Sequence, residues 1–217
     1  MQIFNSFTNE LEQKLLLSKL PGLPSQLKMA PVTRLEELKK MNLSLEEMGN
    51  IARKSAVLIL FYPKNDETHI AMIKRATDNT VHSDQISFPG GKVEKSDPSL
   101  IYTALREANE EIGIISESVK IIGSLTKLHI PPSNFDVYPF VGVMYDTPSF
   151  NSNYEVQKIL EVDLKTLLNP ATLTFKKIQH RTGNDFVVPC YYIQDEVVWG
   201  ATAMIISELL EIVNGDS

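Results

Sequence analysis

Apolar residues recur at helical spacing near both ends of the chain. They predict a first helix over residues 6–20, which stops at Pro21 and Gly22. A second helix is predicted over residues 201–213, where the sequence runs ATAMIISELLEIV. Between these ends, the stretch LPGLPSQLKMAP suits an extended connection, and residues 35–48 suit short helical pieces.

Strand-like segments fill most of the chain between residues 55 and 194. The apolar run AVLILFY is followed by turn residues at 63–66 and then by HIAMIKR, which indicates a hairpin. Further strands are predicted in VKIIGSLTKL, YPFVGVMY, EVQKILEVDL and VVPCYYIQ, and a third helix near residues 98–112. This mixture favours an α/β fold of the α+β type, with helices packed on a mixed β-sheet.

The change in pattern near residue 51 predicts the domain organisation. We expect residues 1–50 to form an N-terminal helical extension and residues 51–217 to form one domain. No Gly/Ser-rich linker interrupts the segment from Ser55 to Ser207, so a second domain boundary is not expected there.

Composition narrows the class of protein. The chain has 217 residues, of which 43% are hydrophobic and 22% charged, as in ordinary globular proteins. Its formal net charge of -6 disfavours electrostatic binding to nucleic acid or anionic membranes. Cys190 is the single cysteine, which excludes an intrachain disulfide and a four-thiolate zinc site. Without a signal peptide or a membrane-length apolar run, we expect a cytoplasmic protein. Its oligomeric state is open, a homodimer included.

The third helix carries the most informative pattern. Asp97 and Pro98 suit a helix start, with Asp97 as the cap, and Gly113 suits a helix end. An apolar stripe can face the core, and it consists of Leu100, Ala104, Ala108 and Ile112. We therefore expect the chemistry on the opposite side of this helix.

Three glutamates share one side of the same helix. Glu107 precedes Glu110 by three residues and Glu111 by four, so their carboxylates project together. Like charges at this spacing repel, and the C-terminal end of a helix dipole adds to the cost. A divalent cation would reverse both penalties, and hard oxygen ligands suit Mg²⁺ or Mn²⁺. Taken alone, such an acidic run is also typical of a solvated helix face.

The surroundings of these glutamates resemble the Nudix box, which contains a glycine, an acid, Arg-Glu, Glu-Glu and a final glycine at set spacing. The matching residues are Gly91, Asp97, Arg106, Glu107, Glu110, Glu111 and Gly113. The first acid is Asp rather than Glu, and eight rather than seven residues separate it from the arginine. This variation is known in the coenzyme A pyrophosphatase branch of the family.

The resemblance implies an α/β/α sandwich and roles for the box residues. Glu107, Glu110 and Glu111 would ligate the metal, and the Gly91 backbone would contribute an oxygen. Arg106 would pair with a box carboxylate and hold it in place rather than contact substrate. For Asp97 a helix cap is favoured over a direct metal contact.

A second signature points to coenzyme A. Arg75-Ala76 and the later Phe88-Pro89-Gly90-Gly91 resemble the signature of the coenzyme A-cleaving branch, and the resemblance extends from Ala56 to Leu210. Thr80 and Asp84 depart from it, because the pattern has Arg and Gly at those positions. A lost arginine removes a phosphate ligand and an acid adds repulsion, so both departures weaken the coenzyme A assignment.

Several residues outside the box are candidates for the site. A pyrophosphate substrate needs cationic donors, and those near the box are Arg75, Lys74, His82 and Lys92. Surface charge also explains the two lysines, and a turn also explains His82. Glu155 occupies a position where related enzymes have a base or an extra metal ligand, although it is also compatible with a solvated loop.

The function implied is metal-dependent hydrolysis of the pyrophosphate in a nucleotide-type small molecule. Coenzyme A or a CoA thioester would give 3′,5′-ADP and 4′-phosphopantetheine or its acyl form. The alternatives are the same reaction on ADP-ribose or a dinucleotide, a Nudix-fold binding module without catalysis, and a structural domain whose acidic helix binds no cation.

Overall fold

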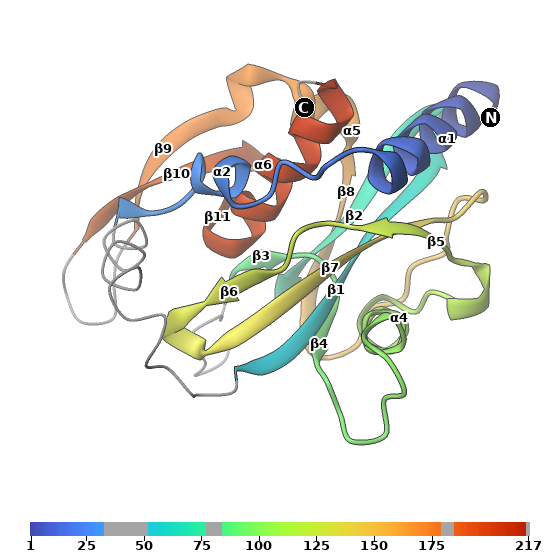
Figure 1. The fold of residues 1–217 in the computed structure, drawn as a ribbon, viewed down its shortest axis with the longest axis horizontal. Coiled ribbons are helices and arrows are strands. Elements are labelled where there is room, and N and C mark those ends of the chain that lie inside the picture. The colour runs from blue at the N-terminus through green and yellow to red at the C-terminus, as the bar shows by residue number, and fades with distance from the viewer. Residues whose placement is uncertain (33–51, 77–83, 179–184, 216–217) are drawn as a thin grey trace.

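The computed structural model describes residues 1–32, 52–76, 84–178 and 185–215 (Figure 1). The α-helices are α1 (Gln2–Leu17), α2 (Leu23–Leu27), α4 (Leu100–Ile112), α5 (Leu164–Leu168) and α6 (Gly200–Asn214). Short 3₁₀ turns are η1 (Ser116–Ser118), η2 (Pro131–Ser133) and η3 (Pro170–Thr172). The strands are β1 (Arg53–Lys64), β2 (Glu67–Arg75), β3 (Ile86–Ser87), β4 (Gly90–Lys92), β5 (Lys120–Ser124), β6 (Leu128–Ile130), β7 (Phe135–Val143), β8 (Val156–Asp163), β9 (Leu173–Ile178), β10 (Phe186–Ile193) and β11 (Glu196–Trp199). Among the described helices, none has the length and apolar composition needed to cross a membrane.

The larger sheet is mixed, as the sequence predicts. Its strand order is β3-β2-β1-β7-β5, with β4 paired to β1, β6 to β7 and β8 to β2. Strand β1 runs parallel to β7, with Ile59 opposite Val141, and antiparallel to β2, with Phe61 opposite Ile70. The start of β1 pairs instead with β4, where Ala56 lies opposite Gly91. The β3–β4 segment therefore enters the sheet where β1 and β2 separate.

Helices cover both faces of this sheet, which confirms the predicted sandwich (Figure 1). Alternating residues of β1 point to opposite faces, because side chains in a strand alternate. Leu58 and Leu60 pack in the core beneath α4, whereas Ile59 and Phe61 pack in the core shared with α1 and α6. A second sheet, of order β11-β10-β9, contacts α6.

The two N-terminal helices are tied to α6. Helix α1 contributes Phe4, Leu11 and Leu15 to the same core as the sheet, and the segment after α2 contributes Met29 and Ala30. The fully buried Glu208 of α6 accepts hydrogen bonds from Gly22 N at 3.2 Å, Gln26 Nε2 at 2.8 Å and Thr126 N at 3.1 Å. One carboxylate thus joins the N-terminal segment to the loop after β5. The expected boundary at residues 50 and 51 lies outside the described residues.

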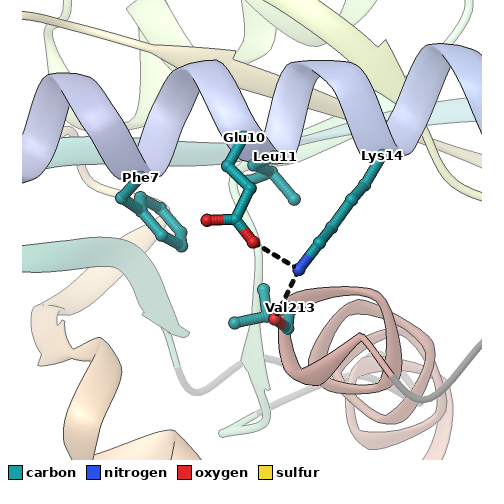
Figure 2. A pocket seen from close by; sticks show the side chains of 5 residues that line it. All are labelled: Phe7, Glu10, Leu11, Lys14 and Val213. Carbon is teal, nitrogen blue, oxygen red and sulfur yellow. Dashed lines mark hydrogen bonds and ion pairs between the residues drawn. The ribbon is translucent and has the colours of Figure 1, made fainter.

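Figure 2 shows a small pocket between α1 and α6. Its lining includes Phe7 and Leu11, and Lys14 Nζ spans it to Glu10 Oε1 at 2.8 Å and to the Val213 carbonyl at 3.0 Å. Its volume of about 60 Å³ is far below the several hundred Å³ typical of sites for small-molecule ligands. The Lys14 contact across this pocket therefore joins α1 to α6, and the pocket itself is too small to hold a nucleotide.

Three predicted elements differ from the structure. The stretch LPGLPSQLKMAP is not an extended connection throughout, because α2 forms within it, with a proline in its first turn. Helix α1 begins at Gln2 and ends at Leu17, rather than covering residues 6–20, and its buried face extends back to Phe4. The strand predicted in VKIIGSLTKL is present but shorter, because β5 ends at Ser124 and β6 begins at Leu128. The interruption has a physical cause: the Thr126 amide donates to Glu208 instead of continuing a strand ladder. The expected helical pieces at 35–48 lie outside the described residues.

Candidate active site

Helix α4 is capped at both ends by its own sequence. Ser99 Oγ accepts a hydrogen bond from Tyr102 N at 3.1 Å, and Gly113 takes a left-handed conformation with φ 72° after the last turn. The prediction of Asp97 as the cap is wrong, because the helix begins at Leu100 and a serine lies directly before it. The apolar stripe packs as predicted, with Ala104 and Ala108 buried.

Arg106 links the start of α4 to its acidic end. Its guanidinium donates to both oxygens of Asp97, from Nε at 3.0 Å and from Nη2 at 3.1 Å. It also contacts Glu107 Oε1 and Glu110 Oε2, each at 3.1 Å, and the Lys92 carbonyl at 3.2 Å. Hydrogen bonding to Arg106 lowers the pKa of Asp97 to about 2. Asp97 therefore anchors the arginine that orients the two glutamates.

Glu111 is buried, with 2% of its surface exposed, so it does not lie on the solvated face that an acidic run taken alone would suggest. Its two oxygens are held separately: Gly90 N donates to Oε2 at 2.8 Å, and Arg75 Nη1 lies 3.3 Å from Oε1. Burial, together with the charges of Glu107 and Glu155, raises the pKa of Glu111 to about 7, although the contacts with Gly90 and Arg75 lower it. The fold therefore holds the Glu111 carboxylate where burial and neighbouring negative charges destabilise its ionised form.

Gly90 is the residue that the sequence prediction missed. It has φ 153°, and a Cβ at this position would lie 2.3 Å from the Ala56 carbonyl oxygen, so only glycine fits. Its neighbour Gly91 faces Glu107, because a Cβ there would lie 2.4 Å from the Glu107 carboxylate. The Gly-Gly pair was a signal in the sequence, and its function is to let α4 carboxylates approach β4 closely.

Glu155, from a loop, acts on Glu107 and Glu111, and we call these three residues the carboxylate cluster. Its charge raises the pKa of both Glu107 and Glu111, alongside the larger effect of burial on each. The loop is attached to α4, since Asn153 N donates to the Glu111 carbonyl at 3.3 Å. It is also attached to the end of β2, since Ala76 N donates to the Glu155 carbonyl at 2.7 Å. Chain segments distant in sequence thus meet around Glu111.

The four cationic candidates have different positions. Arg75 contacts the carboxylate cluster, as described above. Lys74, the preceding residue of β2, forms ion pairs with Glu196 at 3.0 Å and Asp84 at 3.3 Å. Consecutive strand residues point to opposite faces, so the structure does not bring Lys74 to the cluster. The Lys92 residue is exposed, and His82 lies outside the described residues.

The chemistry of the cluster fits a divalent cation. Its donors are carboxylate oxygens, the ligands preferred by Mg²⁺ and Mn²⁺, and a cation would offset the repulsion between Glu107, Glu111 and Glu155. These carboxylates affect one another through their charges, but among the residues that the structure describes no three acidic, His or Cys side chains are arranged closely enough to hold a cation without moving. The Glu110 side chain, 52% exposed, is turned towards Arg106.

Comparison with known proteins agrees with this geometry. A family model of the NUDIX domain matches residues 52–177. The chain belongs to the Nudix hydrolase family. It is 34% identical over 183 residues to the "Uncharacterized Nudix hydrolase NudL" of Yersinia enterocolitica, covering 82% of this chain and 92% of that one. A NudL of Photorhabdus laumondii is 35% identical, covering 74% and 85%. The crystal structure of the Nudix hydrolase RenU from M. smegmatis is 13% identical with a TM-score of 0.49, covering 76% and 87%.

Family membership confirms the resemblance found in the sequence and gives the class of reaction. As a Nudix hydrolase, the protein is a pyrophosphatase that acts on nucleoside diphosphate derivatives. Nudix hydrolases in general use divalent metal ions, in agreement with the donor set described above.

We expect Arg106→Ala to lower both stability and activity. The substitution leaves the fully covered Asp97 carboxylate without its main partner, which should cost about 2–3 kcal/mol of unfolding free energy. Thermal melting and kcat/KM measurements would test this. Arg106→Lys should restore only part of each, because lysine lacks the planar fork. Lost activity with an unchanged melting temperature would show that Arg106 contacts substrate and has no supporting role.

The Asp97–Arg106 pair also predicts a dependence of stability on pH. Because the folded-state pKa of Asp97 is lowered to about 2, its contribution is complete above its ordinary pKa near 3.8. It is lost as the pH falls from about 4 towards 2. The difference in unfolding free energy between the wild type and Asp97→Asn should therefore be constant from pH 7 to 5 and should shrink below pH 4. Urea unfolding at each pH would measure it, and a constant difference down to pH 2 would contradict it.

Proposed function

We propose that this hydrolase cleaves the pyrophosphate of coenzyme A or a CoA thioester. The products would be 3′,5′-ADP and 4′-phosphopantetheine or its acyl form. One observation carries the proposal: both ends of the coenzyme A-type signature contact the same carboxylate. Arg75 lies at one oxygen of Glu111, and the amide of Gly90 lies at the other. The signature residues thus lie at the candidate active site, and this supports inferring the substrate from them.

We assign the divalent cation, Mg²⁺ or Mn²⁺, to Glu107, Glu110 and Glu111, with the Gly91 carbonyl as a further ligand. When bound, the cation would lower the pKa of water and neutralise charge on pyrophosphate oxygens. Glu110 has to turn from Arg106 to join this set, a change that its exposed side chain permits.

The remaining residues orient groups or move protons. Arg106 orients Glu107 through a hydrogen bond from Nη2, and Asp97 orients the arginine by accepting a hydrogen bond from the same nitrogen. We assign Glu155 as the group that accepts the proton of the attacking water, or else as a further ligand, because its charge acts on both buried glutamates. We assign Arg75 to the substrate: its side chain is 30% exposed, and its planar fork suits phosphate oxygens.

A second candidate substrate is ADP-ribose or another nucleoside diphosphate that has no 3′-phosphate. One observation favours it: Asp84, where the coenzyme A pattern has glycine, forms an ion pair with Lys74. Glu196 contacts the same lysine at 3.0 Å. The charge of Lys74 is therefore neutralised by two carboxylates, and this lysine is not available to bind an additional dianion.

Parallel assays would test the assignment. CoA, dephospho-CoA, ADP-ribose and diadenosine polyphosphates would each be incubated with Mg²⁺, Mn²⁺ or EDTA, and nucleotide products separated by chromatography. We expect cation-dependent release of 3′,5′-ADP from CoA and slower cleavage of dephospho-CoA, because groups built to bind the 3′-phosphate would be unpaired. Faster cleavage of ADP-ribose would reject the CoA assignment and leave the cation site standing. No cleavage of any compound would reject both.

A further inference from the structure

Tyr154 is a large aromatic side chain in an unusual position beside the active site. It is 87% exposed, whereas Tyr62, in the core beneath α4, is completely buried. It directly precedes Glu155, whose charge reaches both Glu107 and Glu111. The ring is therefore at the rim of the carboxylate cluster, and none of the roles assigned so far uses it.

The backbone around Tyr154 is held from both sides. Before it, Asn153 N donates to the Glu111 carbonyl at 3.3 Å, and the Asn153 side chain accepts from Glu155 N at 2.8 Å. After it, the Glu155 carbonyl accepts from Ala76 N at 2.7 Å, next to Arg75. The loop thus fixes the Cα of Tyr154 relative to the C-terminal end of α4 and the end of β2, which both carry residues of the site. An aromatic ring on such a support loses little freedom when it binds a ligand.

The phenol of Tyr154 interacts with the Glu155 carboxylate. Hydrogen bonding to the Glu155 carboxylate, together with the charge of that group, raises the pKa of the Tyr154 phenol above its ordinary value. The hydroxyl end of the ring is therefore near Glu155, and because 87% of Tyr154 is exposed, the faces of the ring are available to solvent. A flat ligand that reaches the cluster through its phosphates could lie against one of these faces.

We propose that Tyr154 is the platform on which the purine base of the nucleotide half of the substrate stacks. This inference rests on the proposed nucleotide hydrolase function and adds the subsite that recognises the base. Arg75 and the cation would hold the phosphates, and the ring would hold the base. Stacking of a base on an aromatic side chain favours binding by roughly ten- to a hundredfold.

The test compares Tyr154→Ala with Tyr154→Phe, which keeps the ring and removes the hydroxyl. Tyr102→Ala is the matched control, because Tyr102 is an exposed tyrosine in the first turn of α4, at the opposite end from Glu111. Each variant would be titrated calorimetrically with AMP and with ribose 5-phosphate, which carries a phosphate and no base. For any nucleotide that the wild type cleaves, KM and kcat would be measured separately.

We expect Tyr154→Ala to weaken AMP binding and to raise KM by about tenfold or more, with kcat nearly unchanged. Ribose 5-phosphate binding should be unaffected, and Tyr154→Phe and Tyr102→Ala should behave as the wild type. Three results would overturn the proposal: unchanged AMP binding in Tyr154→Ala, equal loss in Tyr154→Phe, or equal loss of ribose 5-phosphate binding. Absence of turnover in the wild type would reject the proposed function instead, because the AMP titration does not require hydrolysis.

Discussion

Replacing Glu111 by Gln is expected to lower kcat/KM by at least about a hundredfold while the protein stays folded. Loss of groups that only support metal ligands costs 10- to 100-fold, and removal of a charged ligand should cost no less. The glutamine oxygen can still accept the Gly90 amide, so the local structure should persist. Activity would be measured against Mg²⁺ concentration, and folding by circular dichroism and thermal melting.

Glu107→Gln should give the same result, since its carboxylate packs on Gly91 in the same cluster. The matched control is Glu117→Gln, in the exposed turn η1 that follows α4, which should leave activity unchanged. Near-normal turnover of either cluster variant at limiting Mg²⁺ would show that the glutamate concerned is not an essential ligand.

Replacing Glu208 by Ala is expected to destabilise the protein by about 3–5 kcal/mol, because it removes the acceptor of three hydrogen bonds whose donors are buried or half-buried. These donors are the amides of Gly22 and Thr126 and the side chain of Gln26. For a chain of this size, the loss should lower the melting temperature by roughly 6–20 °C. Differential scanning calorimetry would measure the shift.

The control for this substitution is Glu211→Ala on the same helix. Glu211 forms an ion pair with Lys28 whose lysine side chain is 63% exposed, and exposed pairs contribute about 1 kcal/mol or less. A shift for Glu208→Ala no larger than that for Glu211→Ala would mean that water satisfies the three donors, and that the N-terminal segment does not depend on this carboxylate.

The sequence predicted the parts of the site that depend on local spacing. The stripe of Ala104 and Ala108 follows from the helical period, and the ending at Gly113 follows from the freedom of glycine to adopt the left-handed conformation. Both features need only a few neighbouring residues. The mixed sheet could also be predicted, because its strands are bounded by clear turn residues.

Features that depend on distant partners could not be predicted in the same way. Ser99 rather than Asp97 caps α4 because Arg106, two turns away, binds the aspartate. Glu111 is buried because Gly90 supplies an amide to it from another strand. The signature favoured Arg75 over Lys74, but Lys74 remained a candidate until the strand geometry placed the two side chains on opposite faces. The first two cases are decided by contacts between residues that are not neighbours in the sequence.

The parallel pairing of β1 with β7 has a consequence for biosynthesis. Ile59 pairs with Val141, so the ribosome makes the apolar run of β1 well before its neighbour exists. At about 5–20 residues per second, the delay is on the order of several seconds. During this time β2 can cover only the end of one edge, where Phe61 meets Ile70. The nascent chain therefore exposes an unpaired strand edge that is prone to aggregation. The yield of folded protein in the cell should depend on chaperones and on the speed of translation between β2 and β7.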